Sequence, residues 1–154
     1  MENTAEKPRQ ETAREEINAV EMRLQSRGEN VALARLMAAA MVADRDMTLA
    51  ELDEIKVAVS EAVSNAIIHG YENKPGCWVK IRFALYSDAL TVTVRDDGVG
   101  IEDVAAAMRP HFTMSKDHMG LGFAFMHSFM DNVEVESIPG EGTTVILTKR
   151  LRQL

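Results

Sequence analysis

The chain has 154 residues, of which 46% are apolar and 27% charged, so it is large enough for one globular domain with a real core and is not disordered throughout. With 17 Lys and Arg against 24 Asp and Glu, its formal net charge of −7 argues against a general nucleic-acid binder. The single cysteine, Cys77, excludes an internal disulfide and a cysteine-based zinc cluster, and the lack of a long apolar run or a secretory signal predicts a cytoplasmic protein without a membrane span.

Residues 1–18 are polar, which predicts an N-terminal tail ahead of a single domain over residues 19–154. From Val20 onwards apolar and polar side chains alternate up to Gln25, which is the pattern of a half-buried strand. Residues 29–43 are rich in Ala, Leu and Met, which are strong helix formers, so a first helix is expected there.

A second and longer helix is expected to begin at Thr48, because Thr48 and Glu51 form a capping-box pattern. Apolar residues recur on one face of this segment, and Gly70 is expected to end it. Alternating apolar side chains then predict a hairpin of two strands, over residues 79–85 and 90–94.

The last third of the chain predicts a short helix over about 102–108, a helix near 120–130, and two final strands over 133–137 and 143–151. Strands and helices follow one another without regular βαβ alternation. This order predicts an α+β fold, a two-layer sandwich in which helices cover one face of a mixed or antiparallel sheet.

Glu61 and Asn65 form the first candidate site, because their i, i+4 spacing puts both side chains on one face of the long helix. A carboxylate can accept a proton from a hydroxyl, and an amide oxygen one turn away can help to hold a hard cation such as Mg²⁺. An isolated pair of this kind is more often a solvated helix face, so it does not define a site alone.

Asp96 is the second candidate, because counting by twos from Val92 and Val94 places it on the apolar side of its strand. A carboxylate on the core side requires a hydrogen-bond donor, which an adenine amino group would supply, and Gly98 and Gly100 would let the backbone approach a ligand closely. The equally weighted alternative is that the strand ends at Arg95 and Asp96 only opens a turn.

Two further glycine motifs follow. Gly120 and Gly122 open a predicted helix, whose free N–H groups and dipole favour a phosphate. The turn Gly140 to Gly142 delivers Thr143 into the last strand, which is also the ordinary pattern of a hairpin. Each motif is weak evidence when it is taken alone.

The order of these motifs resembles the ATP-binding fold shared by DNA gyrase, Hsp90, sensor histidine kinases and the MutL mismatch-repair protein. The segment from Ser60 to Tyr71, SEAVSNAIIHGY, most closely resembles the sporulation anti-sigma-F factors (stage II sporulation protein AB), a family of serine kinases. The resemblance extends from about Val20 to the C-terminus, and it is supported by residues 52–56, 129–131, 142–144 and 147–149.

The resemblance implies a role for each candidate residue, with ATP or ADP and Mg²⁺ as cofactors. Glu61 would be the catalytic base and Asn65 the Mg²⁺ ligand. Asp96 would hold the adenine amino group, with Gly98 and Gly100 shaping its pocket.

By the same resemblance, Gly120 and Gly122 would bind the phosphates at a helix start, and Thr143 would back the adenine site. Residues 109–119 would form a lid over the triphosphate, although this segment is shorter than the family pattern. Arg35 matches an arginine that the family uses at its protein-partner surface.

The resemblance implies a homodimer that, with ATP bound, holds a sigma factor of the sigma-F type away from RNA polymerase. It also implies transfer of the γ-phosphate to a serine of an anti-anti-sigma protein. Two alternatives are a nucleotide-binding anti-sigma module without kinase activity and an anti-sigma kinase for a general-stress sigma factor. A sensor histidine kinase is disfavoured, because residues 1–19 contain no phospho-accepting His.

Overall fold

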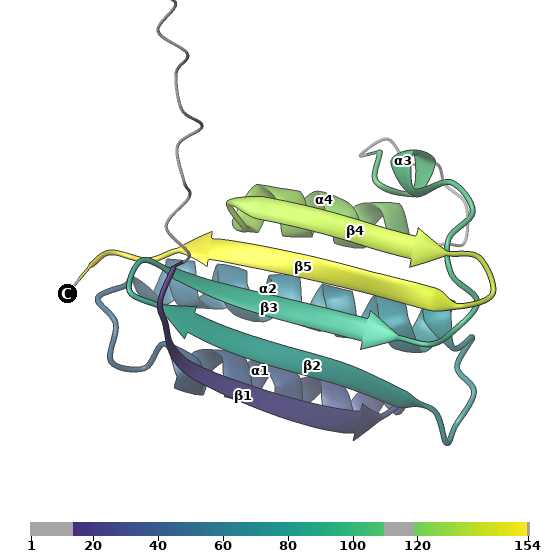
Figure 1. Ribbon diagram of the computed structural model, residues 1–154, viewed down its shortest axis with the longest axis horizontal. Helices are drawn as coiled ribbons and strands as arrows, with labels where there is room; N and C mark the ends of the chain where they lie inside the picture. Colours follow the sequence, from purple (N-terminus) through teal and green to yellow (C-terminus); the bar gives the residue numbers. More distant parts are fainter. Residues whose placement is uncertain (1–13, 110–118, 154) are drawn as a thin grey trace, which may run out of the picture.

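The computed structural model describes residues 14–109 and 119–153, which form a sheet with helices on one side (Figure 1). The strands are β1 (Glu16–Gln25), β2 (Trp78–Tyr86), β3 (Ala89–Asp96), β4 (Asn132–Ile138) and β5 (Gly142–Arg150). Their order in the sheet is β1-β2-β3-β5-β4, and every neighbouring pair is antiparallel. The predicted α+β sandwich is confirmed, with a wholly antiparallel sheet.

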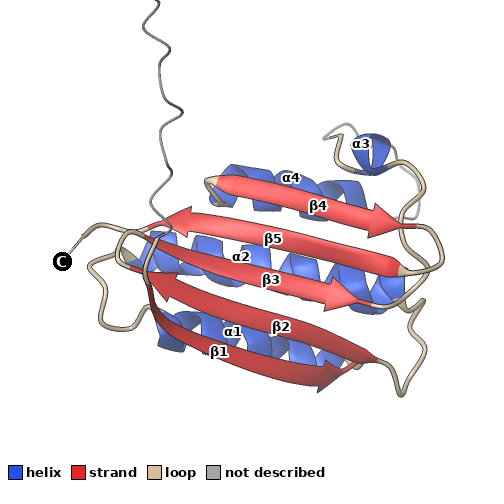
Figure 2. Ribbon diagram, in the orientation of Figure 1, coloured by secondary structure: helices blue, strands red, loops and turns tan. Residues whose placement is uncertain are grey.

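The helices are α1 (Val31–Met41), α2 (Leu49–Asn65), α3 (Val104–Ala107) and α4 (Met119–Phe129). A π-helical turn, Ala66–Gly70, continues α2. In Figure 2, α1, α2 and α4 lie behind the sheet, and no helix of the described residues covers its other face, which is called the open face below. None of the described helices has the length and apolar character needed to cross a membrane.

The start of α2 is fixed by the predicted capping box. The N–H of Glu51 donates to Oγ1 of Thr48 (3.1 Å), and the N–H of Thr48 donates to the Glu51 carboxylate (2.7 Å). One face of α2, including Ile55, Val59 and Ala62, is buried between the sheet and the flanking helices. A capped helix with a buried stripe gives the candidate site a rigid support.

Several element boundaries differ from the predicted ones, among them those of β1, the first helix and β3, which runs to Asp96. β1 begins at Glu16, inside the stretch expected to be a tail, because Glu16 pairs with Tyr86 and its carboxylate accepts from the Arg82 guanidinium (2.6 Å). The first helix is shorter than residues 29–43 at both ends. Its N-terminal turn tightens into a 3-10 turn, as helix ends often do, and residues 42–44 form a turn after Met41. Residues 1–13 of the predicted tail lie outside the described residues.

Candidate functional site

Asp96 is the last residue of β3, and its side chain points toward the helix layer, where it is only 5% exposed. The ladder continues through this residue, because Asp96 pairs with Thr143 of β5. The prediction that Asp96 lies on the core side is therefore confirmed, and the alternative that the strand ends at Arg95 is wrong. Thr143 is buried beside it.

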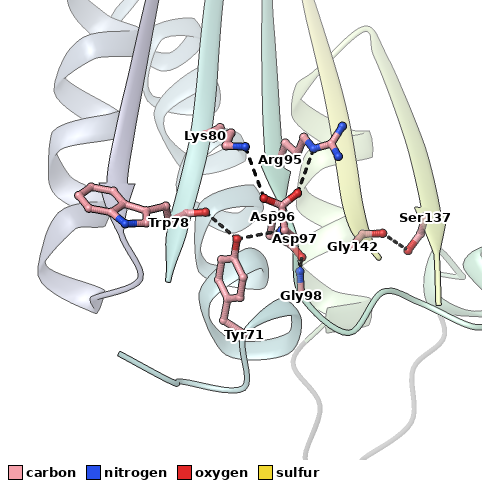
Figure 3. Close-up of polar contacts among 9 residues, drawn as sticks. All are labelled: Tyr71, Trp78, Lys80, Arg95, Asp96, Asp97, Gly98, Ser137 and Gly142. Carbon is pink, nitrogen blue, oxygen red and sulfur yellow. Dashed lines mark hydrogen bonds and ion pairs between the residues drawn. The ribbon is translucent and has the colours of Figure 1, made fainter. Parts of the chain in front are cut away.

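The Asp96 carboxylate is held from one side by backbone amides. The N–H of Gly98 donates to its Oδ1 (2.9 Å), as Figure 3 shows, and the N–H of Thr143 is a second donor. Burial raises the pKa of Asp96 to about 6, and these two amides oppose the rise. The carboxyl group is thus oriented, largely desolvated and able to accept a further hydrogen bond.

Glycines surround Asp96 because side chains would not fit. A β-carbon on Gly70 would lie 2.6 Å from Oδ1 of Asp96, and Gly142, with φ of +125°, packs against the Asp96 backbone. The carbonyl of Gly70 accepts from the N–H of Val99 (2.9 Å), which holds the loop after β3 against the end of the π-helical turn. Gly70 was predicted only as a helix stop, and its contact with Asp96 is an addition to the site.

Glu61 and Asn65 lie on α2 directly against the start of α4. A β-carbon on Gly122 would lie 2.9 Å from Oε2 of Glu61 and 3.4 Å from the side-chain oxygen and nitrogen of Asn65. Gly120 is also buried in this first turn of α4. The fold therefore brings together the acid, the amide and the glycine-rich helix start that were predicted separately.

The Asn65 amide group fits a bound ligand. Its Nδ2 is buried and has no hydrogen-bond partner within residues 14–109 and 119–153. A buried polar group without a partner is costly unless a ligand or water satisfies it. Since the amide offers both a donor and an acceptor, it can serve a phosphate oxygen, a water or a hard cation such as Mg²⁺.

A cleft of about 380 Å³, partly open to solvent, connects the two groups of residues. Its polar lining residues include Asn65, His69, Asp96 and Thr143, and its apolar lining residues include Val94 and Phe123. Apolar walls with a few polar groups suit a flat aromatic base that carries a charged substituent.

The comparison with known proteins agrees with this geometry. Residues 24–149 match the histidine kinase-like ATPase domain. The anti-sigma F factor of Clostridium acetobutylicum is 46% identical over 135 residues, covering 86% of this chain and 94% of that protein. That of Caldanaerobacter subterraneus subsp. tengcongensis is 47% identical over 134 residues, covering 86% of this chain and 93% of that protein. The chain belongs to the anti-sigma F factor family.

Solved structures of low sequence identity share the fold of this anti-sigma F family member. The RsbU and RsbW domains of Rv1364c from Mycobacterium tuberculosis align with a TM-score of 0.60 at 20% identity, over 88% of this chain and 32% of that one. The histidine kinase domain of Erythrobacter litoralis EL346 aligns with a TM-score of 0.54 at 22% identity, over 80% of this chain and 60% of that one. The predicted ATPase-like architecture is confirmed.

Two residues in or near the cleft were not among the predicted site residues. His69 lines the cleft, and it lies two helical turns after Glu61 on the face that Asn65 also occupies, which was a usable signal. Ser137 contacts the Thr143 hydroxyl (2.8 Å) and accepts from the N–H of Ile101 (2.7 Å). Its signal was a polar residue at a core-facing position of β4.

Two predicted features, the lid and the partner-binding Arg35, are not part of the cleft. Residues 110–118 of the expected lid are outside the described residues. Arg35 is exposed on α1 and has no ion-pair or hydrogen-bond partner among the described residues. Leu33 and Leu36 beside it are 48% and 66% exposed, so charged and apolar side chains lie together on the surface of α1.

Proposed function

We propose that this chain is an anti-sigma factor that binds ATP with Mg²⁺ and phosphorylates a serine of an anti-anti-sigma protein. The observation that supports this most strongly is that Asn65, which contacts Gly122 beside Glu61, lines the same cleft as the buried Asp96. Membership in the anti-sigma F factor family supports a sigma-F-like factor as the second partner.

ATP would lie along the cleft with its adenine at Asp96. The ionised carboxylate would accept a hydrogen bond from the adenine amino group, and Thr143 would back the ring. Gly98 and Gly100 would shape the pocket by packing closely against the backbone of Gly70 and Ile138. The phosphates would reach the start of α4, where backbone N–H groups and the helix dipole favour negative charge.

At the phosphate end, Glu61 would take the proton of the attacking serine hydroxyl. Asn65 would hold Mg²⁺, which when bound offsets the charge of the transferred phosphoryl group. The described residues contain no group of three or more His, Cys, Asp or Glu that could hold a metal ion, so most remaining ligands would come from ATP and water. The protein would contribute mainly by orienting its reactants.

Sigma-factor binding would use α1, with Arg35 as a charged contact between the exposed Leu33 and Leu36. The active unit would be a homodimer, as in the family resemblance. With ATP bound, the protein would keep the sigma factor from RNA polymerase, and phosphorylation of the antagonist would prevent it from displacing sigma.

Intact-mass analysis of a candidate anti-anti-sigma protein, incubated with this chain and Mg-ATP, tests the kinase assignment. The wild type should add one phosphate and the Glu61→Gln variant none, while Glu72→Gln, an exposed glutamate outside the cleft, should behave as wild type. If the wild type binds ATP but neither it nor the variant transfers phosphate, the chain is a nucleotide-binding anti-sigma module without kinase activity on that partner. If ATP does not bind, the assignment of the cleft is wrong.

A further inference from the structure

The open face of the sheet carries a row of cations across three neighbouring strands. Arg23 of β1 pairs with Lys80 of β2, and Lys80 pairs with Arg95 of β3. Neighbouring strands are about 4.8 Å apart, so the three positions span about 10 Å. Like charges at directly paired positions destabilise a sheet, and this row lies in a chain whose net charge is −7. The row is called the basic row below.

One carboxylate of the chain already occupies part of this row. Oδ2 of Asp97 lies 3.4 Å from Nζ of Lys80, and Oδ1 lies 3.3 Å from Nε of Arg95 (Figure 3). The contacts are long, and the Asp97 side chain is 48% exposed. Exposed pairs of this kind contribute little stability, so another carboxylate can replace Asp97 at low cost.

Arg23 is not neutralised in this way. Its guanidinium lies 4.9 Å from the centre of the Trp78 ring, and it has no carboxylate within ion-pair distance among the described residues. Trp78 itself is 40% exposed. In the next row, by contrast, Arg82 is paired with Glu16 (2.6 Å) and Glu21 (3.5 Å). Within the described part of the chain, Arg23, Lys80 and Arg95 thus share a single carboxylate, that of Asp97, which leaves the basic row with a net positive charge.

The shape and charge of the open face favour the binding of an acidic ligand over β1, β2 and β3. A shallow groove of about 590 Å³, open to solvent, runs over β1, β2 and β3 and includes all three members of the basic row. At the far side of the sheet, β4 carries Glu134 and Glu136, both exposed. An acidic ligand is repelled from β4 and attracted to β1–β3, which gives it a defined position on the face.

We propose that the basic row, Arg23, Lys80 and Arg95, is a docking site for an acidic segment of a partner protein, in which one partner carboxylate takes the place of Asp97. Three cations over about 10 Å match a few closely spaced Asp or Glu side chains. Nucleic acid fits less well, because the net charge of −7 repels a polyphosphate outside this small patch. The site is separate from the nucleotide cleft and from α1, so it goes beyond the proposed kinase and sigma-binding functions.

Fluorescence anisotropy with a fluorescein-labelled glutamate decamer and the full chain, without nucleotide, tests this site at about 50 and about 150 mM salt. The double variant Lys80→Gln with Arg95→Gln should bind the peptide at least about tenfold more weakly than the wild type. Asp97→Asn should bind it more tightly, because the internal competitor is removed. Lys56→Gln, which removes a cation from α2 on the other side of the sheet, should bind as wild type.

Three results would overturn the proposal. One is the absence of peptide binding by the wild type at the lower salt concentration. Another is an equal loss for Lys56→Gln and the double variant, which indicates non-specific attraction. The third is tighter binding of a labelled single-stranded DNA of ten nucleotides than of the peptide. Because the assay contains neither ATP nor an anti-anti-sigma protein, its result is independent of the kinase assignment.

Discussion

Gly122 lies so close to Glu61 that a β-carbon on the glycine would be 2.9 Å from the carboxylate oxygen. The first turn of α4, proposed to bind phosphates, is thus in direct contact with the proposed base. Any side chain at position 122 has to move Glu61, Asn65 or the helix itself. The first turn of α4 can therefore lie this close to Glu61 only because residue 122 has no side chain.

Gly122→Ala should lower the phosphotransfer rate by about tenfold or more, because small displacements of reacting groups are costly. Folding stability should change by less than about 1 kcal/mol, since alanine favours the helix and offsets part of the clash. The rate is measured by intact mass and the stability by urea unfolding. Gly28→Ala is the matched control, because a β-carbon there meets nothing within 4 Å; equal rates for both variants would contradict the prediction.

Asp96→Asn should weaken ATP binding by about a hundredfold while it stabilises the fold at pH 7–8. An asparagine oxygen can still accept from the Gly98 N–H, but its NH₂ group then faces the adenine amino group, and two donors repel. The gain in stability, roughly 1–3 kcal/mol, follows from removing a charge whose burial raises its pKa to about 6. Calorimetric titration and urea unfolding measure the two effects; a variant that is both weaker in binding and less stable would contradict this account.

The pH dependence of adenosine binding should reflect the same group. Because the pKa of Asp96 in the folded protein is raised to about 6, its contribution to stability is fully present at low pH and is lost as pH rises through that value. Adenosine affinity should run the opposite way and fall by up to about tenfold per pH unit below pH 6, as the acceptor becomes protonated. Adenosine is used because ATP phosphates titrate nearby, and Asp96→Asn should abolish the dependence.

Tyr71→Phe should destabilise the fold by about 1–2 kcal/mol and weaken adenosine binding several-fold. The Tyr71 hydroxyl donates to the Trp78 carbonyl (2.6 Å) and accepts from the Asp97 N–H (2.8 Å), so it holds the turn that follows Asp96. Urea unfolding and adenosine titration measure the two effects. Lower stability with unchanged adenosine affinity would show that the hydroxyl supports the fold but does not position Asp96.

Much of the fold follows from local patterns in the sequence. The Thr48–Glu51 capping box predicted where α2 begins, and counting by twos along β3 placed Asp96 on the core side, as observed. These predictions succeed because a helix cap and strand alternation depend on residues within a few positions of one another.

Contacts between distant elements were not predictable in this way. β1 extends to Glu16 because its carboxylate contacts Arg82, which lies 66 positions further along the chain. Gly70 contacts Asp96 and Ser137 contacts Thr143 only after the π-helical turn, β3, β4 and β5 have assembled. The sequence identifies which residues are chemically suitable, whereas tertiary packing decides which of them meet.

Asp96 and Asp97 are consecutive, yet their carboxylates belong to opposite surfaces of the sheet. Asp96 faces the cleft, and Asp97 faces Lys80 and Arg95 on the other side. Because successive residues of a strand point to opposite faces, a slip of one residue in the pairing of β3 would exchange the two carboxylates between the surfaces. The cleft and the basic row are therefore separated by one position along the chain, so a partner that displaces Asp97 acts on the residue bonded directly to Asp96.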